Sequence, residues 1–242
     1  MNTAVAHQLN SFKKRVEDLV KSGVKKDEAI LKSIRKVIIE SKNVRFEGNG
    51  YSQEWFDEAL RRGLPNIPSA VEAFKVFKDA SSVKILTDYG VLSERELEAR
   101  FEINNEIYTK VVQIEARVLG DLSINHIIPT AIAYQNVLIT NVKGIRELFS
   151  DDEDYQNLAG SQLKSIKKIS KHVKAIREMV KELVEVRKES NAITDLPEQA
   201  KAYSTKVKPY LEKIRYHIDK LELIVDDEMW TLPKYRELLF IH

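Results

Sequence analysis

Apolar residues recur at intervals of three and four along nearly the whole chain, and only eight glycines and six prolines interrupt its 242 residues. This spacing indicates amphipathic α-helices, because a strand would require alternation at every second residue. The pattern predicts a first helix over residues 3–21 and a second over 26–41, which places Ile30, Ile34, Val37 and Ile38 on one face. We therefore expect an all-α fold that opens with a helical hairpin around Gly23.

The organisation expected from this pattern is a single helical body over residues 1–242, with an N-terminal helical hairpin over 1–42, an irregular segment with short helices over 43–92 and a long-helix bundle over 93–242. The bundle is an antiparallel arrangement of three long helices. Bends are expected near Pro129 and Pro209, because a proline ring removes one backbone hydrogen bond and displaces the preceding turn. Serines followed three residues later by glutamate predict helix starts at Ser69, Ser93 and Ser150.

The charge balance argues against a polyanionic partner. Lys and Arg (39) nearly equal Asp and Glu (37), which leaves a net charge of +2 and no general attraction to nucleic acid or to a membrane surface. In the basic run over residues 164–190, glutamates interleave with the lysines, which is typical of a solvated helix face. No stretch of 18 apolar residues and no secretion signal are found, and cysteine is absent. We expect a cytoplasmic protein with neither a nucleic-acid nor a membrane partner.

Charged and polar residues stand among the apolar positions of the long helices. An ionic group buried without a partner costs several kcal/mol, so such residues are expected to satisfy one another. Arg117 with Asp121, and Arg215 with Asp219, are each one turn apart. The hypothesis is an interior, structural polar network that fixes how the helices pack. Its candidate members are Glu115, Arg117, Asp121, Asn125, His126, Arg215, His217, Asp219 and Glu222.

No catalytic, cofactor-binding or metal-binding residue is predicted. The five histidines are scattered, and neither HExxH nor a Glu-x-x-His pair occurs. His126 and His217 are candidates to meet across the bundle, where a hydrogen-bonded interior histidine is favoured over a metal ligand. The segment VRFEGNGYS lacks the third glycine and the lysine of phosphate-binding loops, so a turn is favoured there.

Three long segments carry a resemblance to a known family. They are GNGYSQEWFDEALRRGLPNIP, SERELEARFEINNEIYTKVVQIEARVLGDLSINHIIPTAIAYQNVLI and KVKPYLEKIRYHIDKLELIVDDEMWTLPKYRELLF. Together they resemble the C-terminal region of type III glutamine synthetases, large bacterial enzymes of nitrogen metabolism, over residues 2–240. The resemblance implies that the whole enzyme uses ATP, with Mg or Mn, to join ammonia to glutamate in glutamine biosynthesis. It also implies two kinds of partner, the catalytic barrel of the same enzyme and neighbouring subunits of a homo-oligomer.

The motifs of the catalytic barrel have no counterpart in this sequence, so no catalytic, nucleotide or metal residue is carried over. We expect this chain to begin within a longer enzyme, to need no cofactor of its own and to be inactive alone. Two function classes stay open. One is a helical assembly and interaction region of the ligase; the other is an independent helical bundle that binds a ligand or metal through the interior His/Glu/Asp cluster.

Overall fold

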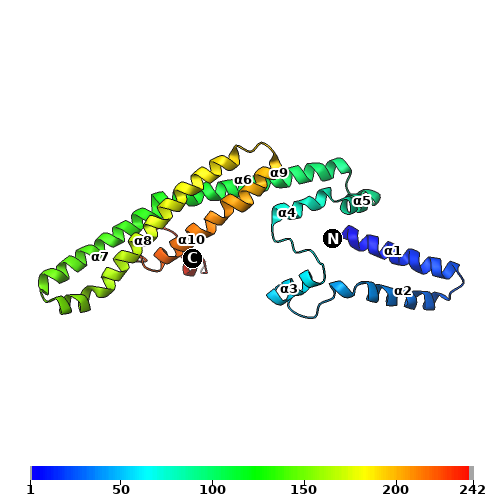
Figure 1. The fold of residues 1–242 in the computed structure, drawn as a ribbon, viewed down its shortest axis with the longest axis horizontal. Coiled ribbons are helices and arrows are strands. Elements are labelled where there is room, and N and C mark those ends of the chain that lie inside the picture. Colours follow the sequence, from blue (N-terminus) through cyan, green and yellow to red (C-terminus); the bar gives the residue numbers. More distant parts are fainter. Residues whose placement is uncertain (1, 240–242) are drawn as a thin grey trace. The chain divides into compact units, whose positions relative to one another are not determined.

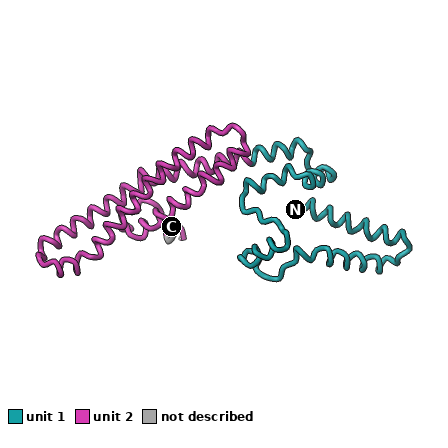
Figure 2. The backbone as a smooth tube through the Cα atoms, viewed as in Figure 1, with its two compact units in different colours: residues 1–104 teal, residues 105–242 magenta. Residues whose placement is uncertain are grey.

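The computed structural model describes residues 2–239, and the described chain is built from helices and turns without a β-strand (Figure 1). The predicted all-α fold is confirmed. The chain divides into two compact units, residues 1–104 and 105–242 (Figure 2). Their boundary lies inside the long helix α6 (Glu94–Leu122). The expectation of a single helical body over residues 1–242 stays a prediction.

Unit 1 opens with the predicted hairpin of α1 (Asn2–Lys21) and α2 (Lys26–Glu40), joined through Gly23 at a φ of 93°. The predicted inner face of α2 is wrong. The residues that α2 buries are the small Ala29 and Ser33, while Ile34 and Ile38 are 42% and 49% exposed. Small side chains let two helix backbones approach closely, and this close contact leaves the larger apolar residues outside.

The remainder of unit 1 consists of short helices. They are η1 (Lys42–Val44), α3 (Gln53–Arg61), α4 (Ala70–Phe74), η2 (Lys75–Lys78) and α5 (Ala80–Asp88), and they precede α6. Ser52 caps α3 by accepting a hydrogen bond from the Trp55 N–H at 3.3 Å. The predicted capping box at the start of α6 is confirmed, because Ser93 and Glu96 exchange hydrogen bonds.

Unit 2 contains the long helices. After α6 come η3 (Ser123–Ile127), α7 (Ile128–Leu148), α8 (Asp152–Asn191), α9 (Leu196–Ala202), η4 (Tyr203–Val207), α10 (Lys208–Glu222) and α11 (Tyr235–Leu238). Short connections turn the chain back after α7 and after α8, so that α7 and α10 each lie alongside α8 (Figure 1). The helix start predicted at Ser150 is wrong by one residue, because Asp151 caps α8 by accepting from the N–H groups of Glu153 and Asp154.

At each of the two predicted bends the structure has an irregular helical turn, and the two turns have the same form. A single π-helical turn, η3, precedes Pro129, and another, η4, precedes Pro209. In each, the N–H directly before the proline donates to the carbonyl five residues back, from Ile128 to Ser123 and from Lys208 to Tyr203. The wider turn accommodates the proline ring, which would clash with the carbonyl of residue i−4 in a regular helix. The helical path from α6 to α7 therefore continues past Pro129, and the path from α9 to α10 continues past Pro209.

The core of unit 2 is centred on α8. Ile169 and Ile176 are fully buried, and Leu183 is 1% exposed. Residues of α7, η4 and α10 complete this core, among them Ala131, Val207 and Ile214. The core also contains the buried side chain of Tyr203. Its hydroxyl group donates to Asn191 Oδ1 at 2.5 Å and accepts from Gln113 Nε2 at 3.2 Å.

Tyr203→Phe is expected to lower the free energy of unfolding by about 1–2 kcal/mol, because two polar partners at the edge of the core lose a hydrogen bond while the ring still fills its space. Urea unfolding measures this loss. The control is Tyr216→Phe, since Tyr216 is exposed. Equal stabilities of the two variants would contradict a structural role for the Tyr203 hydroxyl.

Candidate functional site

The predicted interior network does not lie in the interior. Glu115, Arg117, Asp121, Asn125 and His126 are all exposed. On α10, Arg215 is exposed too, while His217, Asp219 and Glu222 are half-buried. The expectation of an interior network is therefore wrong for these residues in the described chain.

The face that α6 buries in unit 2 explains this error. Asn105, Thr109, Val112 and Ala116 are buried at helical spacing, and Ser123 at the start of η3 continues this line. The predicted charged residues lie on other sides of the same helix. The polar groups that α6 does bury are uncharged, which avoids the desolvation cost of an ionic group.

Only some of the predicted partners come together. Arg215 Nε donates to Asp219 Oδ1 at 2.5 Å, as expected from their spacing, although both side chains are about half exposed. Asp121 accepts from Asn125 Nδ2 at 2.6 Å, and no ion pair joins it to Arg117 in the part of the chain that the structure describes. Glu115 and Arg215 line the same shallow cavity, of about 280 Å³, between α6 and α10.

His217 meets a partner that the sequence did not indicate. Its Nδ1 lies 2.8 Å from Nδ1 of His172, which brings together α10 and α8. The predicted encounter with His126 is wrong, since His126 is exposed on η3. Two imidazole nitrogens at this distance share one hydrogen, so at least one of the two rings must be neutral at the nitrogen that accepts.

The surroundings keep both rings neutral. Burial lowers the pKa of His172 below its usual value of about 6.5, and the charges of His217, Lys171, Lys220 and Lys168 lower it further. Burial also lowers the pKa of His217, followed by the charge of Lys171. Both lowered pKa values favour neutral imidazoles at pH 7, and the hydrogen bond between the rings needs at least one of them to be neutral.

This pair predicts a loss of stability in acid. Below pH 6.5 the unfolded histidines bind protons that the folded ones resist, so unfolding takes up protons and becomes easier as the pH falls towards the lowered folded-state pKa values. The free energy of unfolding, measured in urea between pH 7.5 and pH 5, should fall less steeply in His172→Gln than in the unchanged chain. The control His126→Gln should keep the unchanged slope. An unchanged slope in His172→Gln would contradict the role of the pair.

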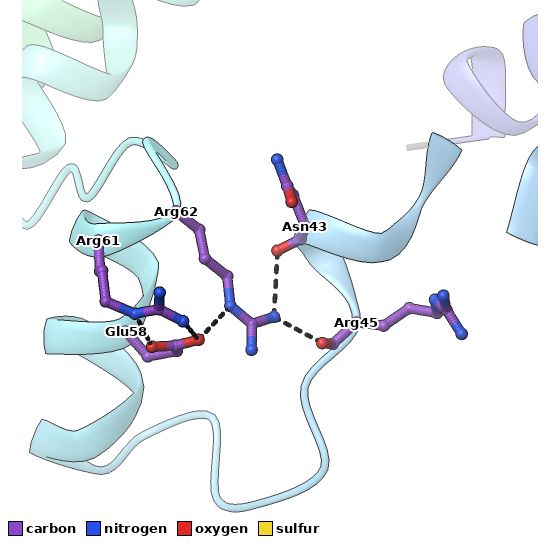
Figure 3. A network of polar contacts seen from close by, with 5 residues as sticks. All are labelled: Asn43, Arg45, Glu58, Arg61 and Arg62. Carbon is purple, nitrogen blue, oxygen red and sulfur yellow. Dashed lines mark hydrogen bonds and ion pairs between the residues drawn. The ribbon is translucent and has the colours of Figure 1, made fainter. Parts of the chain in front are cut away.

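A second cluster of polar groups lies in unit 1 and is centred on Glu58 (Figure 3). Arg61 donates to both carboxylate oxygens of Glu58 at 2.6 Å, and Arg62 Nε donates to Oε1 at 2.5 Å. The hydrogen bonds of these two guanidinium groups lower the pKa of the Glu58 carboxyl to about 2. Glu58 is therefore ionised under all ordinary conditions and neutralises one of the two positive charges beside it.

Arg62 also ties α3 to the segment that precedes it. Its NH1 donates to the backbone carbonyl of Arg45 at 2.7 Å and to that of Asn43 at 3.3 Å, so the guanidinium group lies between α3 and residues 43–45 (Figure 3). A cavity of about 590 Å³ adjoins this cluster and is lined by Lys42, Asn43, Arg45, Glu47, Arg61 and Arg62.

The glycine-containing segment between these elements forms a turn, as predicted. Asn49 Oδ1 accepts from the Tyr51 N–H at 3.0 Å, and the rings of Phe46 and Trp55 pack with their centroids 4.6 Å apart. These contacts describe an Asx turn that leads into a capped helix.

Within residues 2–239, no group of three or more His, Cys, Asp or Glu side chains is arranged to hold a metal ion. In the same range no helix has both the length and the apolar character needed to cross a bilayer.

Comparison with known proteins supplies the family. Residues 29–146 match the family described as glutamine synthetase C-terminal domain. Over 240 residues the chain is 48% identical to a glutamine synthetase of Bacteroides fragilis, a match that covers 99% of this chain and 33% of that protein. It is 30% identical to the type-3 glutamine synthetase of Dictyostelium discoideum over 100% of this chain and 32% of that protein. A glutamine synthetase of Butyrivibrio fibrisolvens is 25% identical over 90% of this chain.

The fold defines the class of protein as an all-helical region with two compact units. The comparisons then identify the family: the chain carries the C-terminal domain of glutamine synthetases and corresponds to the C-terminal region of the type III enzymes. The resemblance inferred from the sequence is thereby confirmed. The chain spans about a third of the length of the curated relatives that it matches.

Proposed function

We propose that this chain is a helical assembly and interaction region of a type III glutamine synthetase, which packs on the catalytic barrel and on neighbouring subunits of a homo-oligomer. The observation that carries the proposal is the amount of apolar surface that its helices leave exposed. Contiguous exposed apolar surface on a folded chain is typical of a surface that another protein covers.

The clearest example is α2. Leu31, Ile34 and Ile38 follow one another at intervals of three and four and are 62%, 42% and 49% exposed. Val37 and Ile39 extend this patch along the same helix. Fully burying one such side chain contributes about 1.5–3 kcal/mol, so a partner that covers the patch gains substantial binding free energy.

A second exposed apolar stripe lies on α6 in unit 2. Ile107, Val111, Ile114 and Val118 recur at alternating intervals of four and three, and each is about half exposed. This is the spacing of a helix face that packs against another helix at a shallow angle. The face lies apart from the buried stripe that contains Val112 and Ala116, so α6 has two apolar faces and the described residues cover one of them.

The activity that we propose for the whole enzyme is the ATP-dependent ligation of ammonia to glutamate, with Mg or Mn, in the cytoplasm. This proposal is supported by the family match and by the similarity of the chain to glutamine synthetases. The alternative, an independent ligand-binding or metal-binding bundle, depended on an interior His/Glu/Asp cluster. The exposure of Glu115, Asp121 and His126 removes that argument.

The isolated chain is expected to form no glutamine from glutamate, ammonia and ATP, because the catalytic residues belong to the proposed barrel partner. A coupled assay for ADP release and a direct assay for glutamine measure this, with the Bacteroides fragilis enzyme as the positive control. Glutamine formation above the blank would contradict the proposal.

The patch on α2 gives a test of partner binding. The chain should bind the Bacteroides fragilis enzyme from which the corresponding third has been removed, and Ile34→Asn together with Ile38→Asn should weaken this binding at least tenfold, since two buried apolar side chains are lost. Surface plasmon resonance measures the affinities.

The control for that test is Lys32→Asn, which places the same amide on an exposed position of the same helix that has no patch residue three or four positions away. It should retain the affinity of the unchanged chain. Equal weakening by the control, or no binding by the unchanged chain, would contradict the proposed role of α2.

A further inference from the structure

We propose that the cavity of unit 1 beside Arg61 and Arg62 binds a small phosphate group, either free or as a phosphate monoester. The cavity measures about 590 Å³ and is lined by Lys42, Asn43, Arg45, Glu47, Arg61 and Arg62. The proposal goes beyond the assembly role, because it assigns a ligand to a part of the chain that this role leaves unused.

The charges that line the cavity favour an anion. Four lining residues are cationic, and Glu47 is the single acidic residue among them. Glu58, which lies next to the cavity, neutralises one further charge. The cluster as a whole therefore carries an excess of two positive charges, which matches a phosphate dianion.

The arginines retain donors for such a ligand. A guanidinium group has five N–H donors in a fixed plane. Arg62 uses Nε and NH1 for Glu58 and for the carbonyls of residues 43 and 45, and no described residue accepts from its NH2. Arg61 uses Nε and NH2 for Glu58, which leaves NH1 without an acceptor among the described residues.

The same bonds hold these donors in place before a ligand arrives. Arg62 is fixed at three points, and its side chain is 22% exposed, so it loses little conformational freedom when it binds. Phosphate oxygens accept pairs of parallel N–H groups from arginine, and such charge-assisted bonds are roughly twice as strong as neutral ones.

Lys42 and Arg45 supply the charge that no acidic residue compensates. Neither forms an ion pair among the described residues; Arg45 donates to the carbonyl of Ile38 at 2.9 Å and extends away from Arg62 (Figure 3). Both lie on the η1 side of the cavity, whereas Arg61 is the last residue of α3 and Arg62 is its C-cap. The positive charge that lines the cavity therefore comes from two segments of the chain.

The test is a calorimetric titration of the intact chain with inorganic phosphate, and separately with glycerol phosphate, at low ionic strength. Lys42→Gln and Arg45→Gln should each weaken binding by up to about tenfold, because each removes one positive charge from the lining of the cavity. Glu47→Gln should tighten binding, because it removes the lining carboxylate that repels the ligand. These three substitutions spare the bonds among Glu58, Arg61 and Arg62, and circular dichroism confirms that each variant folds.

The control is Lys26→Gln, which removes one exposed positive charge from α2 outside the cavity and should bind like the unchanged chain. Binding of inorganic phosphate alone would identify the free ion as the ligand, and binding of the ester would identify a phosphorylated small molecule. No heat of binding with either probe, or the same affinity in Lys42→Gln, Arg45→Gln, Glu47→Gln and Lys26→Gln, would overturn the proposal.

Discussion

Unit 2 depends on the burial of one apolar line along α8. Ile169, Ile176 and Leu183 follow a seven-residue spacing on a helix of 40 residues, and both α7 and α10 pack along this helix. A repeat close to 3.5 keeps a single face towards its neighbours over many turns, so helices that share it cross at shallow angles and remain in contact along their length. The π turns before Pro129 and Pro209 preserve this contact, because they let the neighbouring elements continue past a residue that breaks a regular helix.

The periodicity of the sequence predicted the fold class and the hairpin, and the two prolines predicted where the long helices become irregular, since each feature depends on local chemistry. The choice of the buried face could not be predicted in the same way. Helix α6 has apolar residues around much of its circumference, so Val112 and Val118 look equivalent in the sequence, yet the first is buried and the second is half exposed. On α2 the buried residues are small, and hydrophobicity alone favoured the larger isoleucines that lie outside.

Contacts between residues that are far apart in the sequence could not be predicted from the sequence pattern either. His172 and His217 are 45 residues apart, and only the register of α8 against α10 brings their rings together. The Glu58 cluster likewise depends on the turn that returns α3 to residues 43–45. The sequence contained a signal for each of these contacts: His217 lies within an apolar stripe, and Arg61 and Arg62 follow Glu58. In each case, however, a hydrogen-bond partner comes from another element of the chain.

We propose that the exposed apolar faces of α2 and α6 are covered by the rest of a glutamine synthetase. Hydrogen–deuterium exchange of the chain, alone and in complex with the remaining two thirds of the Bacteroides fragilis relative, tests this proposal, because a helix at an interface opens less often. Slower exchange is expected over residues 31–39 and 107–118 in the complex, with little change on the solvated face of α8. Equal exchange at α2 and α6 in both states, with complex formation demonstrated, would contradict it.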